Sequence, residues 1–148
     1  MVDNDYLRRF FAALDAGEPV PCPLCGATAN VEEAAPSVTW AVYVRCSAGV
    51  EMPGSERWSA RPCTCASVVA SDEDDAQDKA IAAWNYVAAK QVAWDCVERW
   101  RIVCKVVKDG WAAWSQVSGP VGSTGHFALG GTPHDAVLAV ARKIVEVS

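Results

Sequence analysis

The chain has 148 residues, a length that fits one compact domain or two small ones and excludes repeat arrays and large enzymes. Apolar residues make up 51% and charged residues 21%, which is the balance of a folded protein and not of a disordered or fibrous one. Thirteen Lys and Arg stand against eighteen Asp and Glu. The net charge of −5 argues against binding driven mainly by attraction to a phosphate backbone or an anionic membrane.

The first predicted element is an amphipathic helix over residues 4–15. Its apolar side chains recur at spacings of three and four residues, and Gly17 follows as a stop signal. A tight turn at residues 21–26 precedes two predicted strands, at 29–34 and 38–46. The second strand alternates, and its better core face consists of Val38, Trp40, Val42, Val44 and Cys46.

A long helix is the main element expected in the middle of the chain. It is preceded by a short strand predicted at about residues 57–61. Ser71 and the acidic residues after it form a capping arrangement that opens the helix, because carboxylates favour the positive end of the helix dipole. The apolar stripe supports a helix to about Lys90, or further to Trp100.

The last part of the chain predicts a hairpin followed by a helix. Residues 101–107 and 111–117 flank Lys108-Asp109-Gly110, in which glycine accepts the positive φ that such a turn needs. A third strand is expected at 126–129. Thr132-Pro133 then provides an N-cap and a first-turn proline for a final helix, whose buried stripe consists of Ala136, Val137, Val140, Ala141, Ile144 and Val145.

These elements predict an α+β protein. It comprises an N-terminal helix at residues 1–17, a zinc-ribbon-like antiparallel β unit with a helix at 18–92, and a β-hairpin with a covering C-terminal helix at 93–148. The longest uncharged stretch, about 112–134, contains five glycines and two prolines and cannot be a membrane-spanning helix. The N-terminal segment is acidic and lacks a continuous apolar core, so it does not resemble a signal peptide. We therefore expect a cytoplasmic protein with no membrane partner.

The cysteines carry the clearest chemical signal. Seven of them in a chain without an export signal favour metal binding over disulfides. Cys22 and Cys25, with Gly26 after them, have the form of a zinc knuckle, in which a tight turn brings two thiolates onto one tetrahedron. Cys46 ends the second predicted strand, where a zinc ribbon returns to donate its next ligands. The alternative interpretation is that these thiols are merely small buried apolar groups.

The fourth ligand is ambiguous. A complete ribbon would have a cysteine at position 49, which is Gly49 here, and the next thiols are Cys63 and Cys65. We expect Cys65 as the fourth ligand, with Cys63 as the alternative, and a histidine or loss of the site as the remaining possibilities. Cys96 and Cys104 fall on an apolar helix face and in a hairpin strand, so they are assigned to the core. His126 and His134 have no Cys or carboxylate partner at ligand spacing and are assigned to a loop or to the start of a helix.

Three segments resemble the Lar family of restriction alleviation proteins, small zinc-ribbon proteins of phages and prophages. In chain order they are Pro21-Cys-Pro-Leu-Cys-Gly26, Tyr43-Val-Arg-Cys46 and Asp78-Lys-Ala-Ile-Ala-Ala-Trp-Asn85. The resemblance covers about residues 20–86. The chain departs from the family pattern at the second knuckle, where position 49 lacks the cysteine.

The resemblance implies a phage or prophage product, active in a bacterial host cell, that binds a host defence complex such as a type I restriction-modification system. It implies a structural zinc ion and no enzymatic activity. The sequence likewise contains no P-loop, no GxSxG motif and no recognisable His-carboxylate-nucleophile set, so we expect no catalytic residues.

Two alternative functions stay open. One is an anti-CRISPR or other host-defence inhibitor that acts by protein binding or by acidic mimicry of phosphates, through Asp72, Glu73, Asp74, Asp75 and Asp78. The other is a small zinc-ribbon module that binds nucleic acid, which the net negative charge disfavours.

A segment in the C-terminal part combines cations with aromatic rings, as binding surfaces often do. The candidate partner-binding residues are Arg99, Trp100, Arg101, Lys105, Lys108, Trp111 and Trp114. The alternative is that these tryptophans pack in the core between hairpin and helix.

Overall fold

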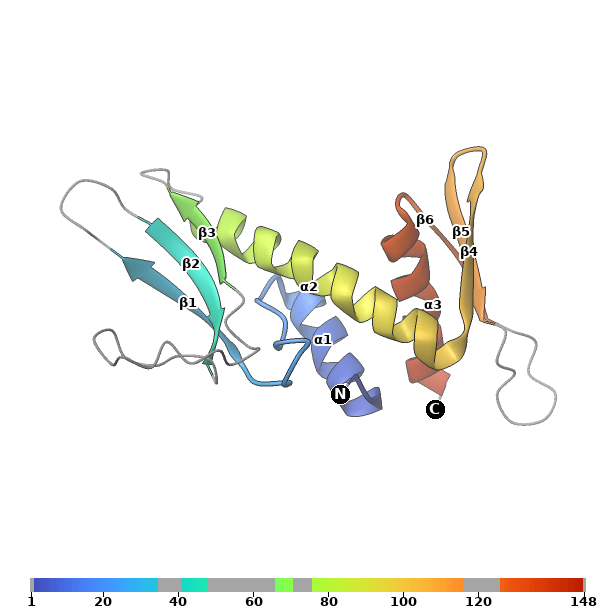
Figure 1. Cartoon of the computed structure of the whole chain (residues 1–148), viewed down its shortest axis with the longest axis horizontal. Helices are drawn as coiled ribbons and strands as arrows, with labels where there is room; N and C mark the ends of the chain where they lie inside the picture. Colours follow the sequence, from blue (N-terminus) through green and yellow to red (C-terminus); the bar gives the residue numbers. More distant parts are fainter. Residues whose placement is uncertain (1, 35–40, 48–65, 71–75, 116–125, 148) are drawn as a thin grey trace. The chain divides into compact units, whose positions relative to one another are not determined.

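The computed structural model describes residues 2–34, 41–47, 66–70, 76–115 and 126–147. This part of the chain contains helices and two antiparallel three-stranded sheets, which confirms the predicted α+β class (Figure 1). In chain order the elements are α1 (Asn4–Ala16), β1 (Ala29–Ala34), β2 (Ala41–Cys46), β3 (Ala66–Ala70), α2 (Ala76–Trp100), β4 (Ile102–Val107), β5 (Gly110–Ser115), β6 (Phe127–Gly130) and α3 (Pro133–Val147).

Two compact units share the chain, and the boundary between them falls inside α2. Unit 1 comprises Asp3–Ala88, and unit 2 comprises Ala89–Ser148 together with Val2. The boundary that we expected from the sequence, between residues 92 and 93, lies in the same helix. None of the helices in the described residues is long and apolar enough to cross a membrane.

Helix α1 forms where the sequence predicts it. The Asp3 carboxylate caps its N-terminus by accepting a hydrogen bond from the Tyr6 backbone N–H at 2.8 Å. Gly17 ends the helix in the left-handed conformation, with a φ of 70°, which a residue without Cβ adopts at little cost. The helix buries one face, consisting of Tyr6, Leu7, Phe10 and Phe11.

The sheet of unit 1 has the order β1-β2-β3, with both pairs antiparallel. The predicted core face of the second strand is confirmed where the structure describes it, because Val42, Val44 and Cys46 are buried. Val38 and Trp40 lie outside the described residues. In the register of β1 and β2, the last residue of β2, Cys46, is opposite the first residue of β1, Ala29.

Strand β3 is an element that the sequence did not lead us to expect. It pairs with β2 so that Ala66 is opposite Arg45. Its five residues, Ala-Ser-Val-Val-Ala, form a short apolar run that is too brief to show a period, although its two valines favour a strand. The strand expected at about 57–61 lies outside the described residues.

Helix α2 continues well beyond Lys90, to Trp100. Its segment contains many alanines and neither glycine nor proline, so nothing in the local sequence interrupts the backbone hydrogen bonds. Arg101, with a φ of 48°, follows the helix and leads into β4. The proposed cap at Ser71 lies outside the described residues.

Unit 2 contains the predicted hairpin, third strand and final helix. Strands β4 and β5 are joined by Lys108 and Asp109, and β6 pairs with β5. Helix α3 packs on this sheet (Figure 1). It begins after Thr132, whose Oγ1 accepts a hydrogen bond from the Asp135 backbone N–H at 3.2 Å. The helix buries Ala136, Val137, Leu138, Val140, Ala141 and Val145, whereas Ile144, expected in the buried stripe, is half-buried.

Candidate metal centre

The turn that carries the first two cysteines is closed by backbone hydrogen bonds. The Gly26 N–H donates to the Cys22 carbonyl at 2.7 Å, and the Cys22 N–H donates to the Ala27 carbonyl at 2.9 Å. Gly26 has a φ of 76°, in the left-handed region that favours glycine. The backbone therefore folds back on itself as expected for a zinc knuckle, and it places Cys22 and Cys25 on the same turn.

The antiparallel pairing of β1 and β2 returns Cys46 to this turn. Strand β1 starts just after the turn, and its first residue, Ala29, is opposite Cys46. The contact continues past the end of the strand, because the Ser47 N–H donates to the Thr28 carbonyl at 3.0 Å. Cys46 therefore lies next to the turn that carries Cys22 and Cys25, because the antiparallel hairpin ends where it started.

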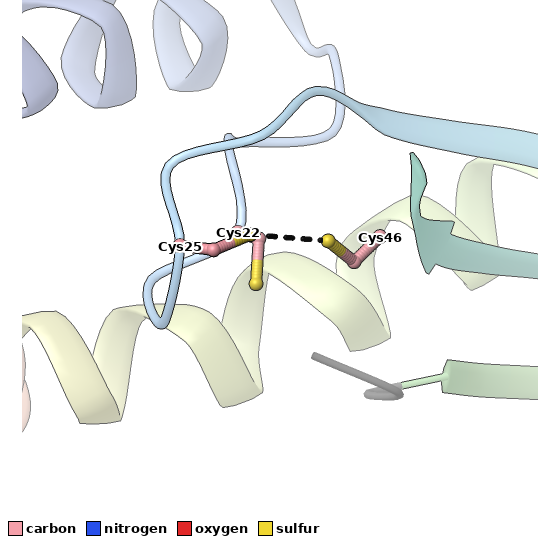
Figure 2. Close-up of side chains that lie close together, drawn as sticks. All are labelled: Cys22, Cys25 and Cys46. Atoms are coloured by element: carbon pink, nitrogen blue, oxygen red, sulfur yellow. Dashed lines mark hydrogen bonds between the residues drawn. The ribbon is translucent and has the colours of Figure 1, made fainter. Parts of the chain in front are cut away.

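The three cysteines converge on one point (Figure 2). The sulfur atoms of Cys22, Cys25 and Cys46 all lie within 4.8 Å of one another, and the Cys25 and Cys46 sulfurs are 3.4 Å apart. Cys22 and Cys46 are fully buried, and Cys25 is half-buried. Within the part of the chain that the structure describes, this is the group of three or more His, Cys, Asp or Glu that can hold a metal ion.

Thiolate sulfurs are soft donors, and clusters of them bind zinc or iron-sulfur centres. A tetrahedron with zinc–sulfur bonds of about 2.3 Å has sulfur–sulfur edges of about 3.8 Å. The spacing within the cluster, 3.4 Å for one pair and at most 4.8 Å for the others, brackets that edge length. The three described residues therefore fit three corners of a tetrahedral site.

Helix α1 supports the knuckle through two hydrogen bonds. The Tyr6 hydroxyl donates to the Pro21 carbonyl at 2.6 Å, and this bond is buried. The Arg9 guanidinium donates to the Gly26 carbonyl at 2.7 Å, which places a positive charge next to the turn that holds the thiols. The sequence did not identify Tyr6 and Arg9 as residues that support the site. An amphipathic pattern shows which face of a helix is buried, but it does not show which backbone carbonyl a side chain will reach.

Helix α2 holds the segment that leads into the knuckle. The Trp84 indole N–H donates to the Val20 carbonyl at 2.9 Å in a buried bond. The Asn85 amide acts twice, since its oxygen accepts from the Val20 N–H at 2.9 Å and its nitrogen donates to the Glu18 carbonyl at 3.0 Å. The Trp-Asn pair thus satisfies the backbone polar groups immediately before the first cysteine.

The two candidates for the fourth ligand, Cys65 and Cys63, lie outside the described residues. The cysteines assigned to the core are placed as follows. Cys96 is buried in α2, and burial, reinforced by Asp95, raises the pKa of its thiol to about 12 despite the opposing effect of Arg99. Cys104 is half-buried in β4.

The candidate partner-binding residues do not share one surface. Opposed residues of an antiparallel pair point to the same face of the sheet. Trp111 is opposite Gly130, and a Cβ at Gly130 would lie 2.4 Å from the Ala136 backbone, so Trp111 is on the face that α3 covers. Trp114 is opposite Phe127 and therefore points to the other face, with Lys105.

The remaining candidates lie at the end of α2 and in the hairpin turn. The Arg99 guanidinium is 4.6 Å from the centre of the Trp100 ring and also donates to the Val2 carbonyl at 3.0 Å. Arg101 and Lys108 are exposed. The expected patch is thus distributed between two faces of the sheet and the end of a helix.

Comparison with protein-family models, with curated proteins and with solved structures found no match.

Proposed function

We propose that Cys22, Cys25 and Cys46 hold a structural zinc ion, with Cys65 as the fourth ligand and Cys63 as the alternative. The proposal is supported by the convergence of three sulfur atoms within 4.8 Å and by the closed knuckle that carries two of them. Zinc is the ion best suited to such a set in a reducing cell, because it accepts tetrahedral thiolate ligands and undergoes no redox chemistry.

The register of β3 favours Cys65 over Cys63. Ala66 is opposite Arg45, the residue before Cys46. Cys65 directly precedes Ala66 in the sequence, and neighbouring Cα atoms along a polypeptide are at most about 3.8 Å apart. Cys63 is three residues from Ala66, a separation that an extended chain stretches to about 10 Å. The covalent structure therefore restricts Cys65 more closely to the neighbourhood of the cluster.

Metal analysis of the purified protein tests this site. We expect one zinc ion per chain, lost in Cys22→Ser, in Cys46→Ser and in only one of Cys63→Ser and Cys65→Ser. Cys96→Ser is the matched control, since this buried thiol lies in α2 outside the cluster, and it should retain the ion. A folded protein without zinc, or a Cys22→Ser variant that keeps its zinc, would contradict the proposal.

A site with four thiolates has no open position for water or substrate, and such zinc ions stabilise structure without taking part in catalysis. We therefore propose a binding protein and not an enzyme. In this role the zinc ion would join the knuckle to the end of β2. Unit 1, stabilised in this way, would contribute to the surface that binds a partner.

We further propose that this protein alleviates restriction in the cytoplasm of a bacterial host by binding a type I restriction-modification complex, as its resemblance to Lar proteins implies. The observation that supports this proposal is the contact between the last segment of the resemblance and the residues just before the first. Trp84 and Asn85 bond directly to Val20 and Glu18, which lead into the Pro21–Gly26 turn. Segments more than sixty residues apart thus form one structural unit.

A plating assay tests this function. Unmodified phage should form more plaques on a restricting host that expresses the protein than on the same host without it, and plating on a restriction-deficient host should not change. The purified protein should also bind the purified restriction-modification complex. If a folded, zinc-loaded protein leaves plating unchanged and does not bind the complex, the proposed function is wrong.

The charged side chains near β4 provide a test of the contact surface. Replacing the exposed Arg101 and Lys105 by Glu should weaken binding of the complex, and replacing the exposed Lys90 of α2 by Glu should not. Binding to nucleic acid, the alternative function, would show a steep loss of affinity with increasing salt. A shallow salt dependence together with binding to the complex supports the protein partner.

A further inference from the structure

We infer that Cys25 and Cys46 form a redox pair, in which a peroxide oxidises the two thiols to a disulfide that removes two of the three described ligands from the metal site. The inference starts from the distance between their sulfurs, 3.4 Å. A disulfide bond has a length of about 2.05 Å, so the two sulfur atoms need to approach by about 1.4 Å. The effect on zinc, but not the disulfide itself, rests on the proposed metal site.

Exposure identifies the thiol that reacts first. Cys22 and Cys46 are fully buried, whereas Cys25 is half-buried at the surface of the knuckle, where a small oxidant can reach it. Leu24, its neighbour in the turn, is exposed. Cys46 then acts as the resolving thiol, because its sulfur already lies beside that of Cys25.

The backbone keeps the two reacting residues together. The turn before β1 is held by the hydrogen bonds that Cys22 makes with Gly26 and Ala27, and β2 is held to β1 up to Ser47, whose N–H donates to the Thr28 carbonyl. A bond between the two sulfurs would therefore close the β1–β2 hairpin onto the knuckle without a change of strand register. The β1–β2 hairpin thus keeps Cys25 and Cys46 next to each other in the reduced protein and in the disulfide form.

The reaction balances with hydrogen peroxide as the oxidant. The Cys25 sulfur attacks one peroxide oxygen, the O–O bond breaks, and a sulfenic acid and one water molecule form. The Cys46 sulfur then attacks the Cys25 sulfur, an S–S bond forms, the S–O bond breaks, and the hydroxyl group leaves with the thiol proton as a second water molecule. Two sulfur atoms lose one electron each, and the peroxide oxygens accept both.

Peptide mapping of the full-length protein tests this pairing. The reduced protein, as purified, is treated with one equivalent of hydrogen peroxide and digested with trypsin and chymotrypsin without reduction. Cleavage after Leu24 separates Cys22 from Cys25, and cleavage after Tyr43 or Arg45 separates both from Cys46. We expect a crosslinked pair of peptides that contain Cys25 and Cys46, lighter than the separate peptides by two hydrogen atoms.

Variants and metal loading separate this inference from the proposed zinc site. The crosslink should persist in Cys22→Ser and Cys96→Ser and disappear in Cys25→Ser. If the chain binds zinc, peroxide should release the ion, and a thiol reductant should restore zinc uptake. A crosslink in a chain that never binds zinc would refute the metal site and leave the redox pair intact. A dominant link between Cys22 and Cys25, a link to Cys63 or Cys65, or a fully reduced product would overturn the inference.

Discussion

Gly110 begins β5 in a conformation that only glycine tolerates. Its φ is 146°, and an added Cβ would lie 2.6 Å from the Gly130 carbonyl oxygen on β6. Gly110→Ala should therefore lower the free energy of unfolding by at least about 3 kcal/mol, because strain and overpacking add. Gly17→Ala is the matched control. Gly17 has a φ of 70° but no atom within 4 Å of its added Cβ, so a loss of about 1–2 kcal/mol is expected. Urea denaturation measures both, and equal losses would contradict the close approach of β5 to β6.

Cys96 gives a pH dependence of stability with a definite sign. Burial raises the pKa of its thiol from 9.0 to about 12. The unfolded chain therefore ionises at this residue first as the pH rises, so the stabilising effect is present below pH 9 and is lost between pH 9 and 12. Stability of the wild type should fall more steeply over this range than that of Cys96→Ala. The comparison uses the slopes of unfolding free energy against pH, because Cys96→Ala also leaves a cavity that lowers stability at every pH. Parallel curves for the two proteins would show that folding does not raise the pKa of this thiol.

The contact of α2 with the segment before the knuckle is the element-scale feature that supports the site. Asn85 satisfies the Val20 N–H and the Glu18 carbonyl. Asn85→Ala leaves the part-buried Val20 N–H without its partner, whereas water can reach the exposed Glu18 carbonyl, and we expect a loss of about 1–3 kcal/mol in the free energy of unfolding. Asn30→Ala, at an exposed position of β1, should change it little. Denaturation followed by circular dichroism provides the measurement, and equal effects would mean that this contact does not stabilise unit 1.

The elements with strong local signals were predicted well. The cap and stop signals of α1 and the Thr132-Pro133 start of α3 act within a few residues, so the sequence alone locates them. For α2, an end at Trp100 was only the second of two predicted ends, after Lys90. The sequence did not decide between them, because neither glycine nor proline marks the end of this helix. Strand β3 was missed because its stability comes from pairing with β2, and five residues carry little pattern of their own.

At the scale of the whole molecule, the two compact units predict that loss of metal acts unevenly. A metal that binds only the folded state stabilises the unit that contains its ligands, and all three described thiols belong to unit 1. Chelation should therefore reduce hydrogen-exchange protection in β1 and β2 strongly, and leave β5 and α3 close to their original protection. Equal loss in both units would indicate that they unfold as one cooperative body, and no loss in either would argue against a structural metal.

The sequence by itself determined the α+β class, the knuckle at Cys22 and Cys25, and the cysteine that would join them, because turn chemistry and strand alternation are local properties of the chain. Only the tertiary structure decided that Tyr6, Arg9, Trp84 and Asn85 hold the knuckle, and that Trp111 and Trp114 point to opposite faces of a sheet. These properties depend on which backbone groups a distant side chain reaches, and that choice is made by strand register and packing and not by spacing along the chain.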